Sequence, residues 1–254
     1  MKERQMGSIL EQFVEYAGEW VSSNIENPSE RERLLGKIKE LPLSVYPYID
    51  KSDAEAINDF VRCVYVIESG YSDWDGFATL QAYFPLDSSV EPHVKEINRL
   101  GKLIHESDVP VVPISKQETA KSFSDFVGYL SILPMHYSDI KSPDKRWVVS
   151  DADKTIENHF LRGIVLSDYS ADFLPLWLIS RRKLYEEKMT LHTYVALLQS
   201  IEAFITNIYL GSVEDFSGQS HREMFGVFAC DVKNGFFEHL PWQIVWHVST
   251  LLAD

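Results

Sequence analysis

The sequence predicts a helix-rich α/β protein with a small parallel sheet flanked by helices and an all-helical C-terminal region. Short runs of β-branched and apolar residues near 62–68, 109–114 and 146–151 are typical of strands. Helical patterns separate these runs, and such alternation favours a parallel sheet. We therefore expect two parts. Residues 1–145 hold a helical N-terminus and a small α/β part, and residues 146–254 hold a strand followed by a helical region.

Three helices are expected before the first strand. Residues 8–25 carry apolar side chains at helical spacing. Asn27 followed by Pro28 is the signal of an N-cap with proline in the first turn of a second helix. Ser52 and Glu55 form a capping-box pattern, which predicts that a third helix begins there.

Strands and helices are then expected to alternate. The run "CVYVIES" begins at Cys63, and "VPVVPIS" ends at Ser115, which could cap a helix whose inward side chains are Phe123, Phe126, Val127 and Leu130. The polar run "HYSDIKSPDK" over 136–145 is interpreted as a loop or a domain boundary.

Only helical patterns follow residue 156. Ser170, Thr190 and Ser220 are placed to start three helices, and Pro241 is placed to open the last one. In that last helix Trp242 and Trp246 stand at i and i+4, and we expect this stripe to dock against the core.

The charge of the chain excludes some classes of partner. Asp plus Glu number 38 and Lys plus Arg 24, which gives a net charge of −14. A broad basic face for nucleic acid and binding to an anionic membrane surface are therefore not expected, whereas the charge permits a basic protein partner or a metal site built from carboxylates. Two cysteines, the lack of an apolar leader and the lack of a long apolar run predict a cytoplasmic protein.

The stretch "WVVSDADKTIENHF", residues 147–160, carries the main functional signal. One interpretation is a capping box, with Ser150 as N-cap and Asp153 as the acid of the first turn. The other is a strand that ends in a pair of carboxylates, at the edge of a parallel sheet where ligands gather. In this second interpretation the pattern resembles the first motif of the haloacid dehalogenase superfamily, most of whose members are Mg²⁺-dependent phosphatases.

The resemblance implies a role for each residue of the motif. Asp151 would be the nucleophile that takes the phosphoryl group from a phosphorylated small molecule, and Asp153 would be the general acid and base. Thr155 would support the turn. Mg²⁺ would bind the Asp151 carboxylate and the backbone carbonyl of Asp153, and it would cancel the repulsion between carboxylate and phosphate.

Further residues extend the resemblance. Ser115 follows an apolar run like that of the second motif and would bind phosphate. The helices after the motif would form a cap over the site, from which Arg181 or Arg182 could reach a substrate phosphate. The family's later motifs are not found between Ile156 and Asp254. A member of this family with this sequence would be incomplete, rearranged or degenerate.

Two functions are therefore predicted as alternatives. The first is a Mg²⁺-dependent phosphohydrolase that uses Asp151 and Asp153. The second is a non-enzymatic acidic interaction protein, such as an immunity or inhibitor protein that neutralises a basic effector. The first is the main prediction; the net charge of −14 and the missing motifs are the observations that motivate the second as its alternative.

Overall fold

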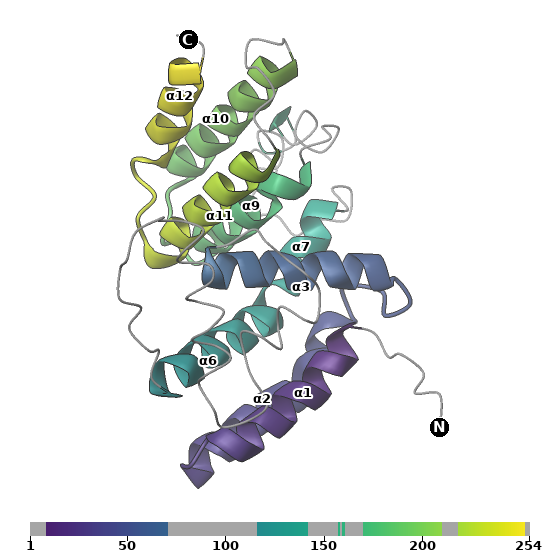
Figure 1. Cartoon of the computed structure of the whole chain (residues 1–254). Coiled ribbons are helices and arrows are strands. Elements are labelled where there is room, and N and C mark those ends of the chain that lie inside the picture. The colour runs from purple at the N-terminus through teal and green to yellow at the C-terminus, as the bar shows by residue number, and fades with distance from the viewer. Residues whose placement is uncertain are drawn as a thin grey trace. The chain divides into compact units, whose positions relative to one another are not determined.

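The computed structural model describes residues 9–70, 116–141, 157, 159–160, 170–209 and 218–251, and the regular elements in these ranges are α-helices (Figure 1). The predicted α/β fold with a parallel sheet is therefore wrong, because this part of the chain is helical and holds no strand. Within the same ranges, no helix is both long and apolar enough to cross a bilayer.

The predicted strand at 62–68 lies inside helix α3 (Ala54–Ser69). Every side chain from Cys63 to Ile67 is buried, so the helix is apolar on all sides over this stretch. A continuous apolar run does not show which period it follows, and β-branched residues then favour the wrong element. The strands predicted at 109–114 and 146–151 lie outside the described residues.

The polar run predicted as a loop begins in a helix. Helix α7 (Pro134–Lys141) starts with proline at its first position, where the missing N–H costs nothing. Its buried side chains include Tyr137 and Ile140, three residues apart on one face. Polar residues surround Tyr137 and Ile140 in the sequence, so their helical spacing did not stand out as a pattern.

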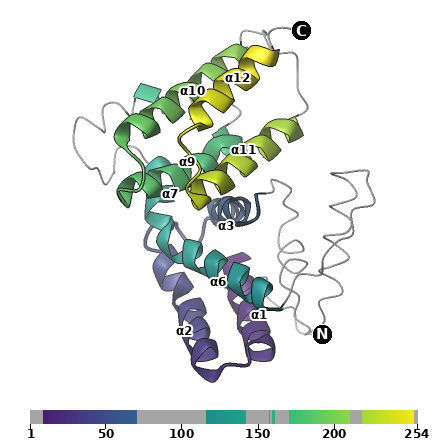
Figure 2. The same ribbon diagram turned by 90° about the vertical axis from the view of Figure 1, so that its left-hand side faces the viewer.

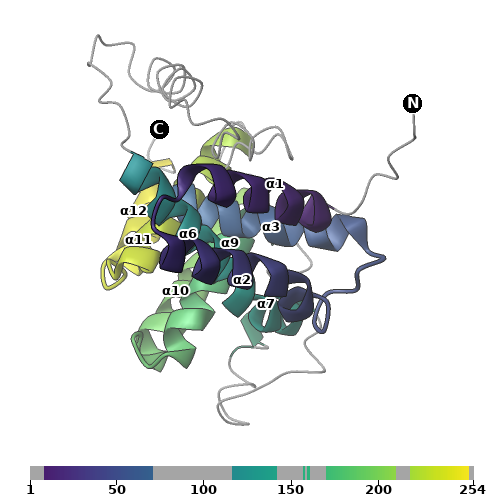
Figure 3. The same ribbon diagram turned by 90° about the horizontal axis from the view of Figure 1, so that it is seen from below.

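The chain divides into two compact units, and the first comprises Met1–Arg62 and Trp74–Pro134. Its described helices are α1 (Ile9–Asn24), α2 (Pro28–Val45), α6 (Lys116–Ile132) and the part of α3 up to Arg62. Helix α2 packs against both α1 and α6 (Figures 2 and 3). Aromatic contacts join α1 to α6 in the core, where Phe13 meets Phe126 at 5.3 Å and Trp20 meets Phe123 at 4.9 Å between ring centroids.

The helix starts of this unit show how well capping signals predict boundaries. The Asn27 side chain accepts hydrogen bonds from the backbone N–H groups of Ser29 and Glu30, at 3.0 and 3.3 Å, as predicted. Helix α3 is capped one residue later than predicted, because Asp53 and not Ser52 accepts from the backbone of Ala56 at 2.9 Å.

The second unit comprises Cys63–Asp73 and Met135–Asp254. Its described helices after α7 are α9 (Ser170–Tyr185), α10 (Leu191–Tyr209), α11 (Gly218–Asn234) and α12 (Leu240–Leu251). Helix α9 packs against α11 and α10, and α10 packs against α12 (Figure 1). Three rings form the centre of this packing, with centroid distances of 4.3 Å from Phe173 to Phe225 and 5.4 Å from Phe204 to Phe225.

Helix α11 also approaches the C-terminal end of α3 at Gly226. A Cβ atom at this position would lie 3.0 Å from the carbonyl oxygen of Gly70 and 3.3 Å from Cγ1 of Val66. Lys233, two turns further along α11, donates to the backbone carbonyl of Glu68 at 2.9 Å and pairs with its carboxylate at 3.1 Å. A cation therefore caps α3 where its carbonyls point outward.

The same substitution at two helical glycines should change stability in opposite directions. Gly128→Ala, in α6, should raise the free energy of unfolding by about 0.5–1 kcal/mol, because its Cβ would meet no atom within 4 Å and alanine favours the helix. Gly226→Ala should lower it, because a backbone carbonyl blocks the new methyl group. Urea denaturation of both variants tests this. A higher free energy of unfolding for Gly226→Ala would show that the carbonyl of Gly70 does not block the methyl group.

Candidate functional site

The structure describes only some of the residues of the predicted phosphohydrolase site. Asp151, Asp153, Thr155 and Ser115 lie outside the described residues, so their predicted roles stay predictions. Arg181 and Arg182 lie in the last two turns of α9, and their guanidinium groups are in different surroundings.

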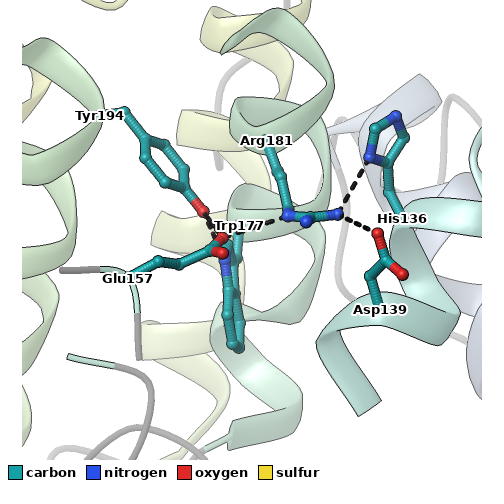
Figure 4. A network of polar contacts seen from close by, with 6 residues as sticks. All are labelled: His136, Asp139, Glu157, Trp177, Arg181 and Tyr194. Carbon is teal, nitrogen blue, oxygen red and sulfur yellow. Dashed lines mark hydrogen bonds and ion pairs between the residues drawn. The ribbon is translucent and has the colours of Figure 1, made fainter. Parts of the chain in front are cut away.

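Arg181 is the centre of a buried polar network (Figure 4). Its Nε donates to the Glu157 carboxylate at 3.1 Å, and its NH1 group donates to the Asp139 carboxylate at 2.8 Å. All three side chains are buried. Burial lowers the pKa of Arg181, but the charge of Glu157 and the hydrogen bond and charge of Asp139 outweigh it, so that the pKa is raised overall.

Two further side chains extend the network from Glu157. The hydroxyl of Tyr194, in α10, donates to Oε1 of Glu157 at 2.7 Å and accepts from the indole N–H of Trp177 at 2.8 Å. Burial first, and the carboxylate of Glu157 next, raise the pKa of Tyr194 well above its ordinary value. This hydroxyl is therefore neutral and serves as a fixed donor.

His136, in α7, completes the cluster. Its Nδ1 lies 3.2 Å from NH1 of Arg181, and because a guanidinium only donates, Nδ1 must accept and Nε2 must carry the proton. The ring is fully buried, and Nε2 has no hydrogen-bond partner among the described residues. Burial, with the charge of Arg181 as a second cause, lowers the pKa of His136 to about 3.

Arg182 lies on the partly exposed side of the same helix. Its guanidinium pairs with Glu186 at 2.8 Å, one turn later, and lies 5.4 Å from the centre of the Tyr185 ring. Lys188 also pairs with Glu186, at 3.0 Å. Burial raises the pKa of Glu186, but Lys188 and Arg182 together lower it by more than burial raises it. The pKa is therefore below its ordinary value, and the carboxylate is ionised. The two arginines are adjacent in sequence, yet the structure gives each its own carboxylate partners.

The arrangement around Arg181 is chemically a closed ion pair. One guanidinium charge is opposed by two carboxylates, at 2.8 Å from Asp139 and 3.1 Å from Glu157. Its effect is to bind α7, α9, α10 and the helical residue Glu157 together. In the part of the chain described, no group of three or more His, Cys, Asp or Glu side chains is placed to hold a metal ion. The predicted Mg²⁺ ligands, Asp151 and Asp153, are not in that part.

Sequence reasoning missed four members of this network: His136, Asp139, Glu157 and Tyr194 as a hydroxyl donor. A signal for Arg181 was present, since Leu174, Trp177 and Leu178 mark the inward face of α9 and Arg181 continues it at helical spacing. A charged residue on an apolar stripe requires a buried partner. Glu157 lies in the stretch that attracted the functional interpretation, but its role is to hold Arg181.

Comparisons of the chain with known protein families, with characterised proteins and with solved structures give no match.

Loss of Arg181 should be far more costly than loss of its neighbour. Arg181→Ala leaves two buried carboxylates without a cation, and we expect the free energy of unfolding to fall by about 3–5 kcal/mol. Arg182→Ala removes a partly exposed pair and should cost about 1 kcal/mol or less. Urea denaturation of both variants measures the difference, and equal losses would contradict the central place of Arg181.

His136 should make the protein less stable as the solution is acidified. The unfolded chain takes up a proton below about pH 6.5, whereas the folded chain does so only near pH 3, so stability is lost as pH falls through this window. The slope contributed is at most about 1.4 kcal/mol per pH unit. His136→Gln should reduce this slope between about pH 6.5 and pH 5, where carboxylates contribute less. The exposed His192→Gln is the control, and an unchanged slope in His136→Gln would refute the assignment.

Proposed function

We propose that this chain is a non-enzymatic acidic interaction protein that binds a basic protein partner, in the way an immunity or inhibitor protein neutralises an effector. The proposal starts from the net charge of −14, which gives the whole molecule a negative field. Such a field raises the rate at which a cationic partner is met and repels acidic proteins.

The observation that carries the proposal is the charge pattern of α1. Glu11, Glu15 and Glu19 are exposed and recur every four residues, so their carboxylates follow one line along the helix. Helix α1 contains no lysine or arginine. Like charges at this spacing destabilise a helix by about 0.2–0.5 kcal/mol per pair. A bound cationic surface would convert this repulsion into attraction.

Helix α9 shows the opposite pattern and makes the contrast informative. There Arg182 and Glu186 stand four residues apart with opposite charges and form an ion pair. The Arg182–Glu186 pair therefore stabilises the helix that carries it. On α1, Glu11 is the acid of the first turn and accepts from the Tyr46 hydroxyl at 3.4 Å, whereas Glu15 and Glu19 are like charges one turn apart on a helix without lysine or arginine. A cationic partner would relieve the repulsion between Glu15 and Glu19.

The phosphohydrolase hypothesis has less support. It requires a parallel sheet, and the stretch 62–68, expected to supply one strand, is helical. Its remaining residues, Asp151, Asp153, Thr155 and Ser115, lie outside the described ranges. The hypothesis has its own test, because beryllium fluoride with Mg²⁺ mimics a phosphoryl group on an aspartate and would raise the unfolding temperature of a working site.

The acidic line of α1 should contribute directly to partner binding. The tagged full chain, purified from its own host at about 50 mM salt, should retain a basic protein, whose affinity is then measured with purified components. Changing Glu11, Glu15 and Glu19 to Gln should weaken that affinity by roughly tenfold or more at low salt, and by less at high salt where charges are screened.

A matched variant separates position from net charge. Changing Glu32, Glu40 and Glu55 to Gln also removes three exposed carboxylates from the first unit, but leaves α1 intact, and should weaken binding less. The proposal fails if no basic protein is retained at low salt. It also fails if Mg²⁺ and beryllium fluoride stabilise the wild type and not Asp151→Asn, since that result would establish phosphoryl transfer.

A further inference from the structure

Helix α12 and the connection before it expose large apolar side chains. Trp242 is 76% exposed and Val245 is 41% exposed, three residues apart on one face of the helix. Phe236, just before the helix, is 73% exposed. The predicted docking of Trp242 against the core is therefore wrong. Among residues 240–245, where the side chains of α12 are described, Leu240 and Ile244 are buried; Trp246, the other residue of the predicted stripe, lies outside these. We call Phe236, Trp242 and Val245 the aromatic surface.

The composition of α12 is typical of a helix that is buried on all sides. Between Leu240 and Leu251 the helix contains no Asp, Glu, Lys or Arg. A helix that is apolar all round is normally buried on all sides, yet here one side packs against α10 and the other presents a tryptophan. Exposed tryptophan is the side chain most enriched at the energetic centre of interfaces.

The charges around the aromatic surface indicate the chemistry of its partner. Two cations of α11 are already neutralised, since Arg222 pairs with Asp172 at 2.7 Å and Lys233 pairs with Glu68 at 3.1 Å. Two carboxylates lie close to the aromatic surface along the chain and have no cationic partner among the described residues. Glu238 stands between Phe236 and Trp242, and the backbone carbonyl of Asp231 accepts from the N–H of Phe236 at 2.8 Å. The connection between α11 and α12 therefore carries uncompensated negative charge, whereas α12 itself contains no charged residue.

We propose that the aromatic surface is the docking site for a cationic amphipathic helix of a basic protein partner. Trp242 and Val245 would pack between the apolar side chains of that helix, and its flanking Lys and Arg would face Glu238 and Asp231. This inference rests on the proposed function and assigns the site through which the basic partner is held. An apolar centre with a charged rim is the usual anatomy of an interface.

A second copy of the chain is the less favourable occupant. It would bring the same two carboxylates to the same surface, and each copy carries a net charge of −14. Like charges set against each other suppress association, whereas a cationic rim promotes it. Charge complementarity therefore selects the basic partner.

A synthetic helix of leucine and lysine provides a probe that requires no knowledge of the natural partner. Its binding to the full chain is followed by fluorescence anisotropy at about 50 mM salt, where surface charges act over more than 10 Å. Trp242→Ala should weaken binding by at least about tenfold, because the tryptophan is the apolar anchor. Leu43→Ala is the matched control, since Leu43 is also 76% exposed but belongs to the first unit, and it should leave binding unchanged.

A second peptide with serine in place of leucine keeps the charge and removes the apolar face, and it should bind weakly and equally to wild type and Trp242→Ala. If both peptides bind alike and Trp242→Ala has no effect, charge alone acts: the aromatic surface is refuted and the proposed function stands. If neither peptide binds, the aromatic surface is refuted, while the proposed function is decided separately by whether the full chain retains a basic protein at low salt. Trp242-dependent self-association in sedimentation, without peptide binding, would assign the surface to a second copy and overturn the inference. Circular dichroism of Trp242→Ala should match the wild type, because the side chain is exposed.

Discussion

Arg181 is held by two carboxylates that reach it from separate segments of the chain, and the packing of α7, α9 and α10 depends on this ion pair. A buried guanidinium without partners would cost several kcal/mol, so only arrangements that bring both Asp139 and Glu157 to it are stable. A shift of α7 by one helical turn would move Asp139 by about 5.4 Å and break the contact. The network therefore selects one register among several that apolar packing alone would permit.

The sequence was informative where a local signal determines local structure, and misleading where burial determines it. The cap at Asn27 and the inward face of α6 are confirmed, because an N-cap needs only its own first turn and an amphipathic stripe needs only one apolar environment. The stretch from Cys63 to Ile67 is buried on every side, and neither alternation nor helical period is visible in such a run. The error in fold class began there.

The candidate site shows a second limit, which concerns distance along the chain. Arg181 was singled out from the sequence, but Asp139, Glu157 and His136 lie 42, 24 and 45 residues from it, and no spacing rule connects them. What the sequence did contain was a conflict: an arginine on the apolar stripe of α9 that Trp177 and Leu178 define. Such conflicts identify a residue that needs a partner without naming the partner.

Charge is used in two ways in this molecule, and the difference bears on its function. Arg181 pairs with Asp139 and Glu157, Arg222 with Asp172 and Lys233 with Glu68, so these three cations of the second unit stabilise its fold. The acidic excess then remains on surfaces such as α1, where the carboxylates oppose one another. Glu11 contributes to the fold, since it accepts from the Tyr46 hydroxyl at 3.4 Å, whereas Glu15 and Glu19 repel each other at this spacing. These carboxylates and the exposed Trp242 are the features on which the proposed binding of a cationic, partly apolar partner rests.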